Sequence, residues 1–260
     1  GKTYVLPKND GNNHLHGVFI KEMFKGKEEE DALLLERTSP DGEEGFPGTM
    51  QVCVRYRLTE DNSLEIIYDA RSDADTVVNF TNHTYFNLNG QGQGTILDHS
   101  MKIDADLVTV TDEQLIPTGE NIPVEGTPFD FREAKTIARD LDESNTMIGY
   151  GKGYDHNFII DAWEDGQLQT AAELYSPKSG RVLEIQTTQP GIQVYTGNYL
   201  GGSPVSKCGR PYEDYEGVAM ECQHFPDSPN KPEYPGTELR PGEVYKQAII
   251  YSFSVKYHSI

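Results

Sequence analysis

One carboxylate and one histidine lie in apolar, strand-like surroundings at distant points of the chain. Glu221 sits within Val-Ala-Met-Glu-Cys-Gln, and His83 follows the alternating segment Val-Val-Asn-Phe-Thr-Asn. A carboxylate is seldom buried unless it is paired or used in chemistry. A carboxylate and an imidazole can act as base and acid near neutral pH. The two residues therefore suggest a general base and a general acid that distant strands bring together.

Each of these residues also has an interpretation without chemistry. Strand alternation puts Glu221 and Gln223 on one face, and the pattern alone favours a solvated strand face for both. A lone histidine beside aromatic residues, as His83 is beside Tyr85, is more often a hydrogen-bonded core or rim residue. The residues alone leave both interpretations open.

Two further segments carry polar groups that suit a ligand. Asp155 and its neighbours follow a glycine-rich loop, which could present hydrogen bonds to a ligand or form an Asx-turn. Gln193 lies in residues 189–199, where amides alternate with aromatic side chains, a combination that suits hydroxyl-rich sugars. No reaction follows from these residues alone.

The motifs give no support for a metal or cofactor. His14 and His16 have i, i+2 spacing, which would point both to one face of a strand, but nothing nearby supplies a third or fourth metal ligand. Patterns typical of P-loops, dinucleotide-binding loops, nucleophile elbows and zinc proteases are missing from the sequence. We therefore expect no cofactor and no metal.

Composition narrows the class of partner. The 260 residues hold 42 acidic and 22 basic side chains, a formal charge of −20. Such a surface repels nucleic acid and anionic lipid, so a neutral small molecule fits better. Three cysteines without CxxC spacing favour a reducing compartment. With no run near the ~20 apolar residues of a membrane span and no signal-peptide pattern, we expect a cytoplasmic protein. Because the N-terminus is not seen, a periplasmic or secreted location is the alternative.

Strand patterns dominate the chain and predict an antiparallel sandwich or barrel. One helix is predicted at 131–141, with Asp130 as N-cap and an apolar i, i+3, i+4, i+7 stripe. The acidic stretch 25–31 is expected to be a solvated loop, and residues 1–260 to form one domain. Strands are expected at residues 51–58, 64–69, 75–82, 97–103, 156–160, 169–175, 182–187, 193–197, 217–222 and 244–254.

Read together, several blocks resemble the aldose 1-epimerase (galactose mutarotase) family, in the family's order and over nearly the whole chain. They are Asn13-His-Leu-His16-Gly, Ser39-Pro-Asp-Gly-Glu-Glu-Gly-Phe-Pro-Gly48, Asn82-His-Thr-Tyr-Phe-Asn-Leu88, Leu115-Ile-Pro-Thr-Gly119, Tyr154-Asp-His-Asn-Phe158, Thr188-Gln-Pro-Gly-Ile-Gln-Val-Tyr-Thr-Gly-Asn198, Glu221-Cys-Gln-His-Phe-Pro-Asp227 and Leu239-Arg-Pro-Gly-Glu243. The resemblance implies an all-β fold, a large antiparallel β-sandwich of the galactose mutarotase type with one or two short helices.

The resemblance also implies a reaction, the interconversion of α and β anomers of a free aldohexose such as galactose or glucose. Glu221 would take the proton of the anomeric hydroxyl, and His83 would protonate the ring oxygen. By the same resemblance His16, Asp155 and Gln193 hold sugar hydroxyls. Tyr85 and Asn82, on either side of His83, are also expected to contact the sugar. The expected partner is the free sugar, bound by a monomer or homodimer, without nucleic acid or membrane.

The sequence departs from the family pattern at two places. The family's N-terminal strands and their Asn-Arg sugar-binding pair have no counterpart in residues 1–260, and the loop after His16-Gly17 is shorter than usual. A chain that lacked the arginine would bind sugar weakly. Two alternatives remain: a non-catalytic sugar-binding protein of the same fold, and an epimerase of hexose 6-phosphates. The acidic charge and the lack of an Arg/Lys cluster near the motifs argue against the second alternative.

Overall fold

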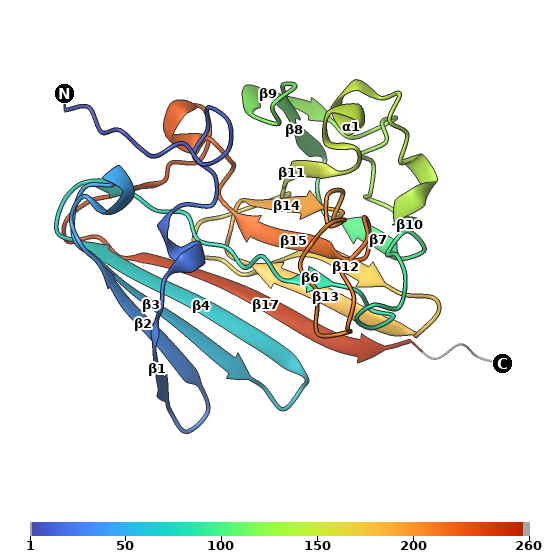
Figure 1. The fold of residues 1–260 in the computed structure, drawn as a ribbon, viewed down its shortest axis with the longest axis horizontal. Helices are drawn as coiled ribbons and strands as arrows, with labels where there is room; N and C mark the ends of the chain where they lie inside the picture. The colour runs from blue at the N-terminus through green and yellow to red at the C-terminus, as the bar shows by residue number, and fades with distance from the viewer. Residues whose placement is uncertain (1, 257–260) are drawn as a thin grey trace.

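Two antiparallel sheets contain nearly all of the strands (Figure 1), and a third sheet has only two strands. The structure is a computed structural model, and it describes residues 2–256. The long strands of the larger sheet run beneath the shorter strands of the second sheet (Figure 1). The prediction of an all-β, antiparallel sandwich is therefore confirmed.

The larger sheet has nine strands, in the order β1-β2-β3-β4-β17-β13-β12-β7-β10. Every neighbouring pair in it is antiparallel. The strands are β1 (Lys25–Glu28), β2 (Leu33–Ser39), β3 (Met50–Leu58), β4 (Ser63–Ser72), β17 (Tyr245–Val255), β13 (Arg181–Thr187), β12 (Gln169–Tyr175), β7 (Ser100–Ile103) and β10 (Lys135–Thr136).

The second sheet has six strands, in the order β6-β15-β14-β11-β8-β9. They are β6 (Tyr85–Phe86), β15 (Val218–Gln223), β14 (Gly191–Tyr195), β11 (Asp155–Ile159), β8 (Leu107–Thr111) and β9 (Pro117–Pro123). The remaining elements are strands β5 (Thr76–Val77) and β16 (Glu238–Leu239), helix α1 (Thr146–Gly151), and 3-10 turns at Val18–Lys21, Glu43–Gly45, Ile137–Asp140 and Ser228–Asn230.

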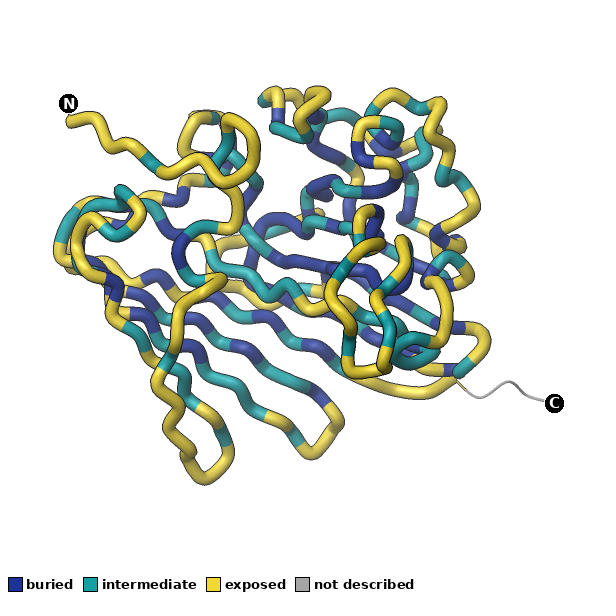
Figure 2. The backbone as a smooth tube through the Cα atoms, in the orientation of Figure 1, coloured by how far each residue is buried: buried dark blue, intermediate teal, exposed yellow. Residues whose placement is uncertain are grey.

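Apolar side chains of the two sheets meet in one buried cluster. Strand β15 contributes Val218, Met220 and Cys222, which alternate along it and are completely buried. Ile249 and Tyr251 of β17 belong to the same cluster. In Figure 2 the strands of the second sheet are largely dark blue, whereas the β1–β2 hairpin is mostly yellow. Because side chains alternate in a strand, the other face of β15 is available for a second purpose.

The predicted helix at 131–141 is wrong. Residues 135–136 pair with β7, and only Ile137–Asp140 form a 3-10 turn. The Asp130 carboxylate does not cap a helix, because it accepts two bonds from the Arg132 guanidinium, each of 2.9 Å. The helix present instead is α1, which Asn145 caps by accepting from the N–H groups of Met147 and Ile148.

Several predicted boundaries also need correction. The stretch expected as a loop at 25–31 forms the exposed edge strand β1. Of the strand expected at 75–82 only residues 76–77 pair, and the strand expected from residue 97 starts at Ser100. Strands β2, β6, β8, β9 and β16 were not predicted. Within residues 2–256, no helix is both long enough and apolar enough to span a membrane.

Two glycines in the connection between β2 and β3 allow a test of backbone strain. Gly42 and Gly48 both adopt positive φ, +82° and +85°. A Cβ on Gly42 would meet nothing within 4 Å, whereas one on Gly48 would collide with the Ser72 hydroxyl and lie 3.1 Å from Ala74 Cβ. We expect Gly42→Ala to lower the free energy of unfolding by ~1–2 kcal/mol, and Gly48→Ala to cost a further ~1–3 kcal/mol through the forced contacts. Urea unfolding of both variants measures the difference, and equal losses would contradict the packing shown.

Candidate functional site

The outward face of the six-stranded sheet gathers the polar side chains predicted from sequence. In the β14–β15 register Gln193 lies opposite Glu221, and in the β11–β14 register Asp155 lies opposite Tyr195. Opposed residues of an antiparallel pair share a face. The Gln193 amide donates a 2.7 Å hydrogen bond to Asp155 Oδ1. Three strands thus bring Glu221, Gln193 and Asp155 together.

His83 reaches the same face from an irregular segment that precedes β6. Its Nε2 lies 3.5 Å from Glu221 Oε1. The Glu221 side chain is only 8% exposed and that of His83 is 30% exposed. The solvated strand face that the pattern alone favoured for Glu221 is therefore wrong, since the carboxylate is buried with an imidazole beside it.

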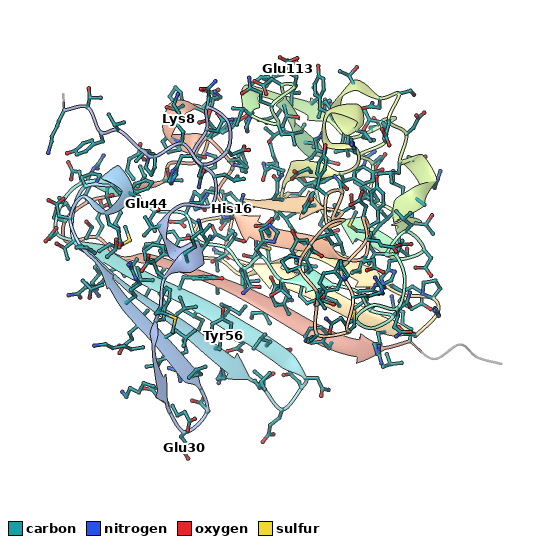
Figure 3. All side chains as sticks on the ribbon, viewed as in Figure 1. Lys8, His16, Glu30, Glu44, Tyr56 and Glu113 are labelled. Carbon is teal, nitrogen blue, oxygen red and sulfur yellow. The ribbon has the colours of Figure 1, made fainter. Side chains whose placement is uncertain are left out.

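The N-terminal segment adds a second histidine. The ring of His16 packs edge-on against that of His83, with centroids 5.3 Å apart. His16 has a positive φ of 62°, so the backbone turns there rather than running as a strand. Figure 3 labels His16 close to the strands of the six-stranded sheet.

His14 does not share this position. Its Nδ1 lies 2.7 Å from the Pro7 carbonyl oxygen, and its ring packs on Phe46. The expectation that His14 and His16 share one strand face is wrong, because the chain leaves extended geometry at His16. In the part of the chain that the structure describes, no three His, Cys, Asp or Glu side chains group so as to hold a metal ion.

Two tyrosines form an aromatic wall around His83. Tyr85 and Tyr195 lie with ring centroids 4.9 and 6.4 Å from the imidazole and 6.1 Å from each other. The Tyr195 hydroxyl accepts a 3.0 Å bond from the Tyr199 N–H. Tyr85 was among the predicted residues, but Tyr195 was not singled out. Its i, i+2 spacing from Gln193 on a strand was the signal that could have identified it.

Asn82 is placed differently from the other predicted residues. Its Nδ2 donates to the Tyr56 hydroxyl at 3.3 Å, and its Oδ1 accepts from the N–H and hydroxyl of Thr84. The carboxamide is thus engaged within the protein on both sides. The structure brings Asn82 next to the site but uses its side chain to shape the turn that carries His83.

Burial perturbs the pKa values of two carboxyl groups, and the charge of Asp155 also acts on Glu221. Burial, and to a lesser extent the charge of Asp155, raises the pKa of Glu221 to about 8. Burial raises the pKa of Asp155 to about 6, opposed by the hydrogen bond from Gln193. A raised pKa makes a carboxyl group a stronger base once it is ionised, so Glu221 is suited to accept a proton.

The two histidines are shifted in the opposite direction. Burial lowers the pKa of His83, with a smaller contribution from His16, and burial also lowers the pKa of His16. A protonated His83 would therefore be a stronger acid than an exposed imidazolium. One face thus holds a strengthened base and a strengthened acid 3.5 Å apart, with hydrogen-bonding groups beside them.

Comparison with known proteins identifies the family. The family model described as aldose 1-epimerase matches residues 1–252. The chain belongs to the aldose 1-epimerase family. The resemblance seen in the sequence motifs is thereby confirmed.

Relatives in this family match along almost all of the chain. A galactose mutarotase of Sus scrofa is 42% identical over 258 residues, which cover 98% of this chain and 73% of that protein. An aldose 1-epimerase of Escherichia coli K12 is 41% identical, and the match covers 97% of this chain and 74% of that protein. A galactose 1-epimerase structure from Lactobacillus acidophilus aligns with a TM-score of 0.82 at 30% identity, over 98% of this chain and 74% of the other. The structure of a GalM/aldose epimerase homologue from C. elegans aligns with a TM-score of 0.87 at 28% identity. The alignment covers 99% of this chain and 77% of the other.

The buried carboxyl group has a consequence for stability. The folded pKa of Glu221, about 8, lies above the ordinary 4.5. The folded state therefore binds the proton more tightly, and the resulting stabilisation is complete below about pH 4.5 and is lost as the pH rises through 8. We expect Glu221→Gln to raise Tm relative to the parent protein at pH 8.5, by about 2–4 °C for each kcal/mol recovered, and the difference to shrink towards pH 5.

Thermal unfolding at both pH values measures this effect. Glu36 is exposed on β2, so Glu36→Gln serves as the control and should show no such pH-dependent gain. A Glu221→Gln protein that is less stable than the parent at pH 8.5 would show that burial of the ionised carboxylate does not destabilise the folded state.

Proposed function

We propose that this chain is an isomerase that interconverts the α and β anomers of free aldohexoses such as galactose and glucose. Two observations support it: membership of the aldose 1-epimerase family, and the placement of the His83 imidazole 3.5 Å from the Glu221 carboxylate on a polar face. Glu221 acts as the general base and His83 as the general acid. Ring opening and ring closure require no metal or cofactor, because both steps need only proton transfer between the sugar and these two side chains.

The reaction is a pair of proton transfers that open and close the sugar ring. Glu221 takes the proton of the hydroxyl on C1 while His83 gives a proton to the ring oxygen O5, and the C1–O5 bond breaks to leave an aldehyde at C1 and a hydroxyl at C5. Rotation about C1–C2 presents the other face of the aldehyde. The C5 hydroxyl then attacks C1, its proton returns to His83, and Glu221 returns its proton to the former aldehyde oxygen.

The pKa shifts determine where the proton lies before sugar binds. With the pKa of Glu221 raised and that of His83 lowered, the pair holds one proton near neutral pH, on the carboxyl group. A C1 hydroxyl that donates to Glu221 favours the carboxylate, and an O5 that accepts from His83 favours the imidazolium. Sugar binding thus moves the proton from Glu221 to His83 without net uptake from solvent.

The neighbouring residues hold the sugar in place. Asp155 accepts hydroxyl hydrogen bonds, and a charged acceptor makes these stronger than neutral ones. Gln193 uses its Nε2 to bond Asp155, while its buried Oε1 has no partner among the described residues and can accept from a sugar hydroxyl. His16 and Tyr85 supply further contacts beside the acid. Asn82 supports the turn beneath the sugar.

A hexose 6-phosphate is a weaker candidate substrate. A phosphate group calls for arginine or lysine. Across residues 2–256, no hydrogen bond or ion pair of His83, Glu221, Asp155 or Gln193 involves either residue type. Two carboxyl groups on the site's face would repel the phosphate. A neutral sugar therefore fits the site better.

The proposed partner and cellular compartment agree with this function. The small-molecule partner is a free sugar, which the protein binds as a monomer or homodimer. The three cysteines Cys53, Cys208 and Cys222 are free thiols in the structure, which suits the reducing cytoplasm.

Removing the base or the acid should abolish catalysis. Polarimetry of freshly dissolved α-galactose measures the approach to anomeric equilibrium above the spontaneous rate. We expect Glu221→Gln and His83→Asn each to lower kcat by about 100- to 10,000-fold, the usual contribution of a positioned acid or base. Glu36→Gln is the control and should keep the parent rate.

The same assay separates the alternatives. A parent protein that binds galactose but leaves the spontaneous rate unchanged is a binding protein, and the enzyme proposal fails. If glucose 6-phosphate is turned over better than glucose, the free-sugar assignment fails instead.

The charge of Asp155 should be visible in the pH profile. Asp155 raises the pKa of Glu221, so Asp155→Asn should lower that pKa. Since the working pair holds one proton, which the free enzyme loses as the pH rises through the pKa of Glu221, the basic limb of kcat/KM moves to lower pH in the variant, and the maximum also falls through lost sugar contacts. A limb that stays in place or moves to higher pH would exclude this coupling. Glu36→Gln again serves as the control.

A further inference from the structure

The two residues of the acid–base pair lie just beyond the last backbone pair between two neighbouring strands. Strand β6 pairs with β15 through Phe86 opposite Val218 and Tyr85 opposite Ala219. Continuing that register by two residues puts His83 opposite Glu221. Among the described residues the backbone ladder between these strands consists of those two pairs only. The segment with His83 therefore follows β15 without ladder hydrogen bonds where the chemistry takes place.

An asparagine side chain replaces the ladder at the far end of this segment. The Asn79 Nδ2 donates to the His224 carbonyl oxygen at 2.8 Å, and the His224 N–H donates to Asn79 Oδ1 at 3.0 Å. A carboxamide carries one donor side and one acceptor side, as a peptide group does. Asn79 lies four residues before His83, and His224 lies three after Glu221, so this clamp joins the chain segments of acid and base.

A buried glutamine strengthens the same junction. His224 Nδ1 lies 2.8 Å from Gln189 Oε1. The Gln189 Nε2 donates to the Phe80 carbonyl at 3.1 Å and to the Tyr245 hydroxyl at 3.0 Å. Because Nε2 faces an acceptor carbonyl, Oε1 accepts and His224 carries its proton on Nδ1. His224 is thus linked both to Asn79 and, through Gln189, to Phe80.

The near end of the segment is fixed in a similar way. The Asn87 Nδ2 donates to the Glu216 carbonyl at 3.1 Å and to the Gly94 carbonyl at 2.8 Å. Residues 79–87, named here the His83 segment, are thus attached to the strand of Glu221 at both ends. Between Asn79 and the first ladder pair at Tyr85 the backbone makes no ladder pairs with β15, which leaves room for the Asn82 turn.

We propose that Asn79 is a positioning residue, which holds the His83 segment in register with β15 and so sets the separation of His83 from Glu221. It touches neither the proposed sugar nor the reacting atoms. The inference deepens the proposed function, on which its catalytic consequence rests. Asn79 is exposed, so its replacement removes the two hydrogen bonds without opening a cavity in the core.

The test compares Asn79→Ala with Asn145→Ala. The Asn145 side chain also makes two hydrogen bonds, in which its Oδ1 accepts from two backbone N–H groups, but it does so at the start of α1. We expect Asn79→Ala to lower kcat about 10- to 100-fold, as small misplacements of catalytic groups do, with the galactose Kd within about threefold of the parent value. Asn79→Asp keeps the acceptor but loses the donor, so it should fall between the parent and Asn79→Ala. Asn145→Ala should keep the parent kcat.

A titration that needs no activity separates this inference from the proposed function. The Glu221 side-chain carboxyl is followed by carbon NMR in the parent and in each variant. A displaced His83 segment admits water to Glu221, so its pKa should fall towards the ordinary value in Asn79→Ala and stay unchanged in Asn145→Ala.

Two combinations of results decide between the positioning role and the proposed function. An unchanged Glu221 pKa and an unchanged kcat in Asn79→Ala overturn the positioning role. A shifted pKa in a protein whose parent form shows no mutarotation supports the positioning role and refutes the proposed function. Because the titration is read on folded protein, loss of activity through unfolding cannot imitate the expected result.

Discussion

The antiparallel register across β11, β14 and β15 is the constraint on which the site depends. Side chains alternate along a strand, so a slip of one residue would turn Glu221, Gln193 and Asp155 towards the core and expose Met220 and Val194 in their place. The apolar face of β15 is completely buried, which makes that slip very costly. Hydrophobic packing on one side of the sheet therefore determines the polar geometry on the other.

The same arrangement generates the electrostatics. A sheet brings side chains of neighbouring strands within a few ångströms of each other, and here two of these side chains are carboxyl groups. Burial raises the pKa values of both groups, and the charge of Asp155 raises the pKa of Glu221 further. Two buried carboxyl groups lower the free energy of unfolding, and the large apolar core of this protein offsets that loss. Strength as a base and stability of the fold are thus opposed at Glu221.

Local patterns predicted the parts of the fold that depend on local rules. Strand β12 has the predicted bounds 169–175, and strand alternation assigned the two faces of β15 correctly. The predicted helix failed because Arg132 takes the carboxylate of Asp130, an interaction that helical periodicity does not reveal. Strand β1, which is exposed along its whole length, has no apolar alternation to detect.

The candidate site was less visible from the sequence than the strands were. The residue types at Glu221 and His83 suggested acid–base chemistry, but nothing local showed that they face each other, because strand pairing is a long-range property. The family resemblance supplied that link. Asn79 escaped notice since its role depends on His224, whose backbone it reaches only after the chain has folded.

The strand order of the larger sheet has a consequence for how the chain folds. Strand β17, near the end of the described chain, lies in the middle of this sheet between β4 and β13 (Figure 1). Until β17 has been synthesised, β1–β4 and β13–β12–β7–β10 are two half-sheets with open edges. Contacts between residues so far apart in sequence slow folding, and unpaired edges invite association between chains. The newly made protein therefore stays exposed to aggregation until β17 joins its two halves.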